Sequence, residues 1–367
     1  MNAPMVGNDS YRMRHALQLA AQGRGLTSPN PMVGAVVVAS DGSIVGNGYH
    51  RWAGEDHAEV IALSAAGYKA SGATLYCTLE PCCHYGRTGP CVKRIIETGI
   101  ARVVVAMLDP NPEVNGGGVT YLRHHGISVD VGVCCDEAMR LNAAFVTWIS
   151  CGRPFVTMKV AASLDGCIAR RVGERTVLTS NESDTAVHEL RSEVDGIGVG
   201  STTLMTDDPL LTVRGVERAR PLVRAVFDRR IRTRPTARVF DTLDKGPVFV
   251  LTTEREFERR QDFARALTDV GAEVEVLPGE GTMEDALEWL GARKLTSLVI
   301  EGGRLVHEAL WSSSLVDRVQ VFVAPIYLGK HGVRWLDRKS IFRTLTSFRV
   351  RSYGPDLLME GDVYRTR

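Results

Sequence analysis

The sequence predicts an α/β protein with two domains. The chain has 367 residues, more than one hydrophobic core usually serves, and 44% of them are hydrophobic. In the second half, apolar strand-like runs alternate with helix-like stretches, which is typical of a mainly parallel sheet covered on both faces. Cys151-Gly152-Arg153-Pro154 combines a glycine and a proline just before a new strand. We therefore expect a first domain over residues 1–150 and a second over residues 151–367.

The composition excludes several classes of protein. Lys and Arg number 44 against 43 for Asp and Glu, so a net charge of +1 gives no general attraction for nucleic acid. No apolar run approaches the ~20 residues of a membrane span, and the N-terminus lacks a signal-peptide pattern. The eight cysteines include adjacent pairs, which favour free thiols or metal ligands over disulfides. We expect a cytoplasmic protein with neither nucleic acid nor membrane as a partner.

The first half begins with a helix and a hairpin. Met13, Ala16, Leu17 and Ala20 recur at helical spacing within residues 11–23. Pro29-Asn30-Pro31 forms a rigid turn into a buried strand at 33–38, which Asp41-Gly42 turns back. The elements expected after the hairpin are a helix at 56–66, a strand at 73–78, a helix at 91–98, a strand at 102–107 and a helix-like stretch at 136–149.

One imidazole, two thiols and a carboxylate follow the pattern of a catalytic zinc site. His57-Ala58-Glu59 matches the first half of the zinc deaminase signature, whereas Cys82 and Cys91 are separated by eight residues rather than two. A catalytic zinc keeps three protein ligands and leaves its fourth position to a water. A carboxylate beside that water can take its proton and pass it to a departing amine. The motif predicts deamination, with His57, Cys82 and Cys91 holding one zinc ion per chain and Glu59 as the catalytic residue.

Simpler interpretations of these residues exist. Asp56 and Glu59 also form a capping-box pattern at a helix start, and the two cysteines can be ordinary buried thiols. Cys83 or His84 can complete a four-ligand structural zinc, which would make the protein a binding module without catalysis.

The second half contains two strand ends that carry glycine. Gly198-Val199-Gly200 lacks the third glycine of the Rossmann fingerprint. Glu301-Gly302-Gly303-Arg304 follows a buried strand and precedes a helical stretch, so its backbone amides can hold a diphosphate, although an ordinary turn explains it equally well. The strands expected in this half lie at 155–160, 196–200, 222–227, 248–251, 297–300 and 319–323, with helices at 254–267 and 283–290.

Several longer motifs resemble one family. They are Pro29-Asn30-Pro31-Met32-Val33-Gly34, Thr78-Leu79-Glu80-Pro81-Cys82 with the insert that leads to Pro90-Cys91, Asp109-Pro110-Asn111-Pro112, and Ser163-Leu164-Asp165-Gly166. Over nearly its whole length the chain resembles the bifunctional pyrimidine deaminase-reductases of riboflavin biosynthesis. Cys83 and Gly89 stand where this family commonly has Ser and Pro. The resemblance implies two α/β/α sandwich domains, the first cytidine-deaminase-like and the second dihydrofolate-reductase-like.

The resemblance also implies two successive reactions. The first is zinc-dependent hydrolytic deamination of 2,5-diamino-6-(5-phosphoribosylamino)pyrimidin-4-one, and the second is reduction of the ribosyl group to ribityl with NADPH. We therefore expect Zn²⁺ and NADPH as cofactors, a small phosphorylated pyrimidine as substrate, and a homo-oligomer. The alternative enzyme is a nucleoside or tRNA base deaminase with an attached reductase, against which the insert before Cys91 and the neutral charge both count.

By the same resemblance, individual residues receive roles. The deaminase substrate would contact Asn30, His50, His84, Arg87, Asp109 and Asn111. The cofactor would contact Ala161, Thr203, Asp207 and Gly303. The reductase substrate would contact Lys159, Arg191, Leu211, Arg214 and Glu301. Arg191 and Arg214 suit a phosphate, while Lys159, Asp207 and Glu301 are the ionisable candidates for proton delivery. Arg229, directly after a strand end, is a hypothesis for binding the 2′-phosphate of NADPH. Arg175 and Val177 depart from the family pattern and receive no role.

Overall fold

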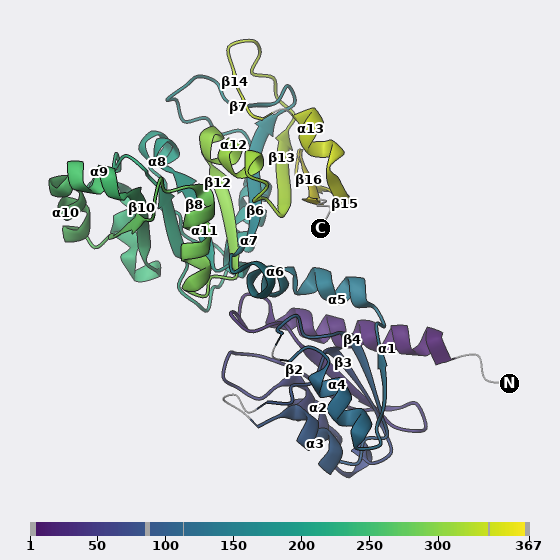
Figure 1. The fold of residues 1–367 in the computed structure, drawn as a ribbon. Helices are drawn as coiled ribbons and strands as arrows, with labels where there is room; N and C mark the ends of the chain where they lie inside the picture. Colours follow the sequence, from purple (N-terminus) through teal and green to yellow (C-terminus); the bar gives the residue numbers. More distant parts are fainter. Residues whose placement is uncertain (1–4, 85–88, 113, 337, 364–367) are drawn as a thin grey trace. The chain divides into compact units, whose positions relative to one another are not determined.

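The chain divides into two compact units between Gly152 and Arg153 (Figure 1). The computed structural model describes residues 5–84, 89–112, 114–336 and 338–363. The division falls inside the glycine-proline sequence expected to separate two domains, two residues later than the predicted boundary.

The first unit is built on a five-stranded sheet with the order β2-β1-β3-β4-β5. Its strands are β1 (Gly34–Val38), β2 (Ile44–Tyr49), β3 (Thr74–Leu79), β4 (Arg102–Met107) and β5 (Ser128–Val131). β1 is antiparallel to β2 and β3, whereas β3, β4 and β5 run parallel. Because parallel strands end at the same edge, the residues after β3 and β4 lie side by side. This edge carries the residues of the expected zinc site.

Helices cover both faces of this sheet. One face packs against α2 (Ala58–Ala66), α3 (Cys91–Glu97) and α4 (Gly117–His124), and the other against α1 (Met5–Ala20), α5 (Cys135–Leu141) and α6 (Ala143–Cys151) (Figure 1). The alternation within β1 explains both layers, since Ala35 and Val37 join the first core and Val36 and Val38 join the second. Two 3₁₀ turns, η1 (Ala21–Gly23) and η2 (Gly67–Ala70), follow α1 and α2.

Some predicted boundaries in this unit were wrong. α1 already includes Met5, and α2 begins two residues later than expected. The helix predicted over residues 136–149 is two helices, because the backbone of Asn142 leaves the helical conformation, with a φ of −99° and a ψ of 20°. The Asn142 side chain accepts a hydrogen bond from the Met32 backbone nitrogen at 2.8 Å and donates one to the Met32 backbone oxygen at 2.9 Å. α4 and β5 were not predicted, since both are short and largely polar.

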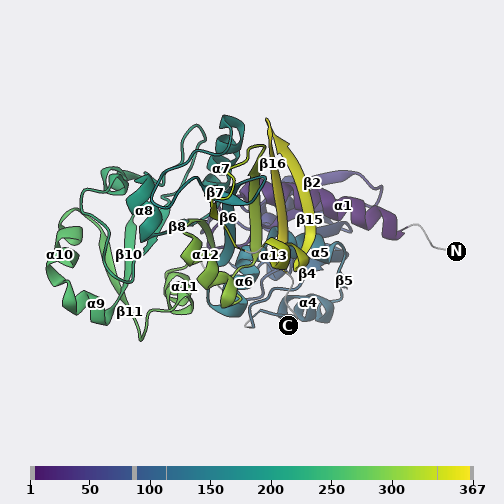
Figure 2. The ribbon, with the colours of Figure 1, turned by 90° about the horizontal axis from the view of Figure 1, so that it is seen from above.

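The second unit is built on a nine-stranded sheet with the order β11-β10-β9-β8-β12-β6-β13-β16-β15. From β11 to β13 all neighbours are parallel, which confirms the expected sheet, whereas the C-terminal strands β16 and β15 add an antiparallel edge that was not predicted (Figure 2). The strands are β6 (Phe155–Ser163), β8 (Gly196–Gly200), β9 (Val223–Phe227), β10 (Val248–Thr253), β11 (Glu273–Leu277), β12 (Ser297–Gly302), β13 (Arg318–Ala324), β15 (Leu345–Tyr353) and β16 (Asp356–Val363). A separate small sheet pairs β7 (Cys167–Ala169) with β14 (Val333–Arg334).

The helices of the second unit again form two layers. Leu298 and Ile300 of β12 pack with α11 (Met283–Ala292) and α12 (Arg304–Ser312), while Val299 packs with α8 (Ser201–Asp207), α10 (Gln261–Asp269) and the 3₁₀ segment η3 (Arg238–Lys245). The remaining helices are α7 (Asn181–Glu193), α9 (Glu254–Arg259) and α13 (Arg338–Arg343). The carboxyl ends of the parallel strands therefore lie together at one edge of the sheet, between the two helix layers that cover its faces.

Candidate active sites

The first unit brings three potential metal ligands together from three different elements. His57 precedes α2, Cys82 follows β3, and Cys91 is the first residue of α3. His57 Nδ1 lies 3.1 Å from Cys91 Sγ and 3.5 Å from Cys82 Sγ, and the three ligand atoms all lie within 4.8 Å of one another. A tetrahedral zinc with bonds of about 2.3 Å to sulfur and about 2.0 Å to nitrogen separates N and S ligands by about 3.5 Å. This donor set therefore fits zinc.

The electrostatics of the cluster favour a thiolate. Hydrogen bonds from Cys91 and His57 lower the pKa of Cys82, and one of them is the Cys91 backbone N–H donating to Cys82 Sγ at 3.3 Å. The pKa of Cys91 is raised in turn by its hydrogen bond with Cys82 and by burial, so the pair shares one negative charge. The hydrogen bond to Cys82 also raises the pKa of His57. Zinc binding to such a site is coupled to proton release, because the ligands bind metal as thiolates and neutral imidazole.

Glu59 lies beside the cluster in the first turn of α2. Its side chain is buried, with 3% of the residue exposed, and its Oε2 has no hydrogen-bond partner among the described residues. Burial raises the pKa of this carboxyl group. The capping-box interpretation is wrong, since His57 holds the N-cap position of α2 and no side chain caps this helix. A buried carboxylate oxygen without a partner, next to three metal ligands, is suited to accept a proton from a reacting water.

The four-ligand alternative is not supported by the described part of the chain. The metal-type cluster found there has three members, and neither Cys83 nor the exposed His84 belongs to it.

The expected wall of the pyrimidine pocket is partly assembled. Asn30 Nδ2 lies 3.1 Å from His50 Nε2, and His50 Nδ1 lies 3.2 Å from the backbone oxygen of Asp56. The His50 ring stands edge-on to the ring of His57, with centroids 5.6 Å apart, and burial lowers the pKa of His50. Asp109 Oδ1 accepts a bond from the Asn111 backbone nitrogen at 2.9 Å, in the loop after β4. Of the other predicted contacts, His84 is exposed and Arg87 lies outside the described residues.

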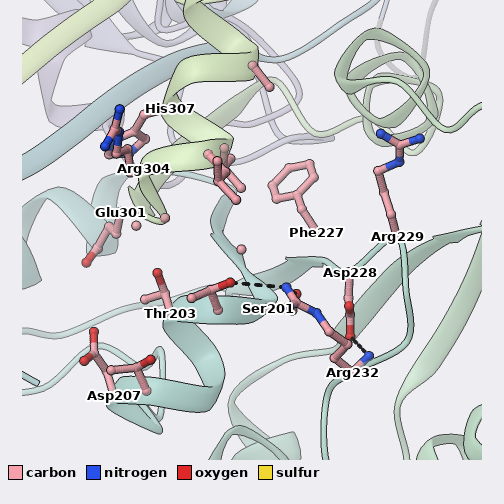
Figure 3. Close-up of a pocket in the computed structure, with 18 of the residues that line it drawn as sticks. Ser201, Thr203, Asp207, Phe227, Asp228, Arg229, Arg232, Glu301, Arg304 and His307 are labelled. Carbon is pink, nitrogen blue, oxygen red and sulfur yellow. Dashed lines mark hydrogen bonds between the residues drawn. The ribbon is translucent and has the colours of Figure 1, made fainter. Parts of the chain in front are cut away.

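The second unit contains a cleft of about 1200 Å³ at the carboxyl ends of its parallel strands (Figure 3). Every residue predicted to contact the cofactor lines this cleft, namely Ala161, Thr203, Asp207 and Gly303. Gly303 has a backbone φ of +95° and precedes α12, so the first amides of that helix are available to an anion. In Figure 3, Asp207 and Glu301 lie on one side of the cleft, and Arg229 and Arg232 lie on the other, with Phe227 between them.

The predicted substrate residues of this unit fall into two groups, those that line the cleft and those that do not, and a buried ion pair joins one member of each group. Lys159 and Glu301 line the cleft, whereas Arg191, Leu211 and Arg214 are not part of its lining. Arg191 donates through Nε and Nη2 to the two oxygens of Glu301 at 2.6 and 2.7 Å, and through Nη1 to the Thr212 backbone oxygen at 2.8 Å. The nitrogens of Arg191 thus donate to protein acceptors, whereas the sequence led us to expect that Arg191 would bind a substrate phosphate.

The charges around Glu301 set its protonation. Burial by itself raises the pKa of Glu301, but the charges of Arg191 and Lys159 outweigh burial and lower that pKa to about 2. Lys159 Nζ lies 3.9 Å from Glu301, and burial lowers the pKa of Lys159. At neutral pH Glu301 is therefore ionised and has no proton to give, while Lys159 is a better acid than an exposed lysine.

One polar group in the cleft had no predicted role. Arg232 Nη2 donates to Ser201 Oγ at 2.8 Å and to Thr202 Oγ1 at 3.2 Å, so it joins the loop after β9 to the start of α8 (Figure 3). Its backbone nitrogen donates to Asp228 Oδ2 at 2.6 Å. The sequence indicates this arrangement only through the spacing of Asp228 and Arg232 in a strand-end loop. The hydroxyl groups that Arg232 contacts could not be predicted, because they lie some thirty residues away along the chain.

Two family models match the chain, one in each unit. The cytidine and deoxycytidylate deaminase zinc-binding region matches residues 6–107, and the RibD C-terminal domain matches residues 154–359. The riboflavin biosynthesis protein RibD of Aquifex aeolicus is 42% identical over 357 residues, which cover 96% of this chain and 97% of the relative. RibD of Escherichia coli is 38% identical over 368 residues, with 96% and 98% covered.

Solved structures agree with these matches. Acinetobacter baumannii RibD is similar with a TM-score of 0.85 and 33% identity, and the match covers 98% of this chain and 100% of that one. A diaminohydroxyphosphoribosylaminopyrimidine deaminase and 5-amino-6-(5-phosphoribosylamino)uracil reductase from Thermotoga maritima is similar with a TM-score of 0.82 and 34% identity, at the same coverage.

A deaminase zinc-binding unit followed by a reductase unit defines a bifunctional enzyme, which is both a zinc-dependent hydrolase and a nicotinamide-dependent oxidoreductase. The predicted fold class is confirmed, with two α/β/α sandwich domains of cytidine-deaminase type and dihydrofolate-reductase type. The chain belongs to the RibD family of riboflavin biosynthesis proteins. This membership decides against the binding-module alternative. Among the described residues, no helix combines the length and the apolar character that crossing a membrane requires.

Proposed function

We propose that the first unit deaminates 2,5-diamino-6-(5-phosphoribosylamino)pyrimidin-4-one and that the second unit then reduces the ribosyl group of the product to ribityl with NADPH. The observation that carries the first step is the cluster of His57, Cys82 and Cys91 with the buried carboxylate of Glu59 beside it. The substrate named for the similar Thermotoga maritima enzyme supports the choice of pyrimidine.

The chain's own residues divide the work of deamination. Zinc, when bound by these three side chains, supplies the Lewis acidity that makes a water nucleophilic near neutral pH. Glu59 accepts the proton of the attacking water at Oε2 and delivers it to the departing amino group, so that ammonia leaves as a neutral molecule. The burial of Glu59 keeps this carboxylate free of competing solvent hydrogen bonds.

Asn30 orients the pyrimidine through a defined face of its amide. The Asp56 backbone oxygen can only accept, so His50 carries its proton on Nδ1 and presents Nε2 as an acceptor. Asn30 Nδ2 donates to that nitrogen, which leaves Oδ1 of Asn30 to accept from an amino group of the substrate. We assign Asp109 and Asn111 to the opposite wall of the same pocket.

In the second unit, Ala161, Thr203 and Asp207 would hold the cofactor in the cleft, and the first amides of α12 beside Gly303 would hold its diphosphate. NADPH supplies the hydride for the ribose carbon. Lys159 gives a proton to the ring oxygen as the sugar opens, because burial makes it more acidic and Glu301 is already ionised. Glu301 holds Lys159 and Arg191 in place, whereas Arg214 and Leu211 do not line the cleft and stay predictions from the family resemblance.

We propose that Arg229 makes the reductase prefer NADPH over NADH. Arg229 follows β9 and lines the cleft on the side opposite Glu301, where a guanidinium group can pair with a ribose 2′-phosphate (Figure 3). Arg229→Ala is expected to raise KM for NADPH about tenfold and to leave KM for NADH unchanged. Arg234→Ala is the matched control, since Arg234 is exposed in the same loop but does not line the cleft. Equal effects on both cofactors would contradict this role.

The expected homo-oligomer and the cytoplasmic location stay predictions. The edge strand β15 favours association of copies, because it is largely exposed and carries Phe348 and Val350 with exposed fractions of 47% and 51%. Sedimentation equilibrium across a range of protein concentrations measures the oligomeric state directly.

The function is tested by ammonia release from the diaminopyrimidine ribotide by zinc-loaded protein before NADPH is added. Release followed by NADPH oxidation, dependent on the deaminated product, is the expected result. NADPH oxidation with the untreated diaminopyrimidine alone, without ammonia release, would overturn the proposed order of steps.

A further inference from the structure

Glu80, which lies between β3 and the ligand Cys82, is engaged entirely by another part of the first unit. Only 3% of it is exposed, and its carboxylate accepts three backbone N–H bonds. Oε2 accepts from Asp109 at 3.2 Å and from Gly116 at 2.9 Å, and Oε1 accepts from Val119 at 3.0 Å. The donors come from both ends of residues 109–119, so one side chain closes the whole loop that follows β4.

Glycines let this loop lie directly on the turn that carries Cys82. A Cβ atom at Gly118 would lie 2.0 Å from the Pro81 backbone oxygen, and one at Gly117 would lie 3.0 Å from Cys83 Sγ. Gly116 has a φ of +75°, a left-handed conformation that side chains disfavour. The loop and the ligand turn are therefore in backbone contact, and Glu80 fixes one against the other.

The rest of the loop is built on this attachment. Asp109 Oδ1 accepts the Asn111 N–H at 2.9 Å, and the Asn111 backbone oxygen accepts from Val114 and Asn115, both at 2.9 Å. These turns are linked in series along the loop, and the residues at its two ends, Asp109 and Gly116 with Val119, are the ones that donate to Glu80. Releasing the carboxylate would free the segment that presents Asp109 and Asn111, while the ligand cluster keeps its own mutual contacts.

We propose that Glu80 is a positioning residue that sets the substrate loop of the deaminase at a fixed distance from its metal centre. This inference rests on the proposed function of that site, in which Asp109 and Asn111 contact the pyrimidine. A purely helix-capping role for Glu80 would involve the start of α4, near Val119, but would not require the bond to Asp109 at the other end of the loop.

Glu80→Gln tests this directly. The amide has nearly the same shape, but it is neutral, and its nitrogen cannot accept from the backbone donors. We expect KM for deamination to rise about tenfold, with kcat changed by less than about threefold, since hydrogen bonds to a charged acceptor are the ones lost. Bound zinc is expected to stay at one ion per chain. Reduction of the deaminated pyrimidine by the same chain is expected to be unchanged, which reports on folding of the second unit, while the zinc content reports on folding of the first.

Binding without turnover gives a second measurement. In a Glu59→Gln background, adding Glu80→Gln is expected to raise the calorimetric Kd of the diaminopyrimidine ribotide about tenfold. Glu97→Gln is the control for charge, because Glu97 is exposed on α3 of the same unit. Gly117→Ala perturbs the contact from the loop side more mildly, because its Cβ would lie 3.0 Å from Cys83 Sγ, and it is expected to raise KM and Kd in the same direction, so it decides the matter if Glu80→Gln does not fold.

These measurements distinguish a failure of the positioning role of Glu80 from a failure of the proposed function. KM and Kd equal to those of the parent proteins in both variants would overturn the positioning role, and so would loss of zinc together with loss of binding, since Glu80 would then serve the ligand turn alone. Absence of ammonia release by the wild type would instead refute the proposed function itself.

Discussion

Glu59→Gln isolates the proton transfer of deamination from metal binding. Glu59 is buried next to the three candidate ligands, is not one of them, and has an Oε2 without a hydrogen-bond partner among the described residues. Glutamine fills the same volume, so the substitution breaks no hydrogen bond at that oxygen and creates no cavity. It removes the ability to take up and return a proton, together with the negative charge of the carboxylate.

The expected loss follows from the two transfers that one carboxylate performs. General acid-base catalysis by a positioned side chain contributes about 10²- to 10⁴-fold. Because Glu59 acts first as base and then as acid in the proposed reaction, we expect kcat for ammonia release to fall about 10³- to 10⁴-fold, or about 4 to 5.5 kcal/mol of barrier. Zinc content and the Kd for the ribotide are expected to stay within about twofold of the wild type.

The assay is ammonia release under saturating ribotide, with zinc quantified in the same preparation and NADPH-dependent reduction of the deaminated product as the control. A variant that retains zinc, keeps its reductase and still releases ammonia within tenfold of the wild-type rate would refute the role of Glu59. Loss of zinc in Glu59→Gln would instead mean that this carboxylate is needed for the metal.

Three further outcomes follow from the structure. Cys91→Ala is expected to lose bound zinc and ammonia release while NADPH oxidation on the deaminated product persists; retained zinc would contradict its place in the ligand set. Glu301 has a folded pKa of about 2 against an ordinary 4.5, so it stabilises the second unit above pH 4.5, and this contribution of about 3 kcal/mol disappears as pH falls towards 2. Urea unfolding followed by tryptophan fluorescence measures it, and Glu301→Gln should lack this part of the pH dependence. Gly34→Ala puts a Cβ 2.0 Å from the Ala16 backbone oxygen and should lower the unfolding free energy by about 3 kcal/mol in the same assay, whereas Gly89→Ala, whose Cβ meets no atom of the described residues within 4 Å, should not.

Local patterns in the sequence were sufficient for the parts of this protein that depend on neighbouring residues. Alternating and continuous apolar runs predicted β1, β8 and β12 within two residues, because burial on a sheet repeats every second residue or fills both faces. The three candidate zinc ligands, which the structure brings together, could be proposed because His57 and Glu59 lie two residues apart and a short motif carries Cys82. The hairpin of β15 and β16 was missed, since Arg349 and Arg351 interrupt the apolar pattern of an exposed edge strand.

The sequence by itself determined the two-domain α/β class and was sufficient to propose the ligand types and the carboxylate of the first site, since these depend on composition and on motifs a few residues long. Only the tertiary structure decided which charges face one another. Arg191 meets Glu301 across 110 residues, and Glu80 holds Asp109 and Val119 across 29 and 39 residues. These pairings follow from the order of strands in each sheet, where crossovers place β3 beside β4 and β12 between β8 and β6. Strand order is a property of how whole layers pack, and no local run of side chains encodes it.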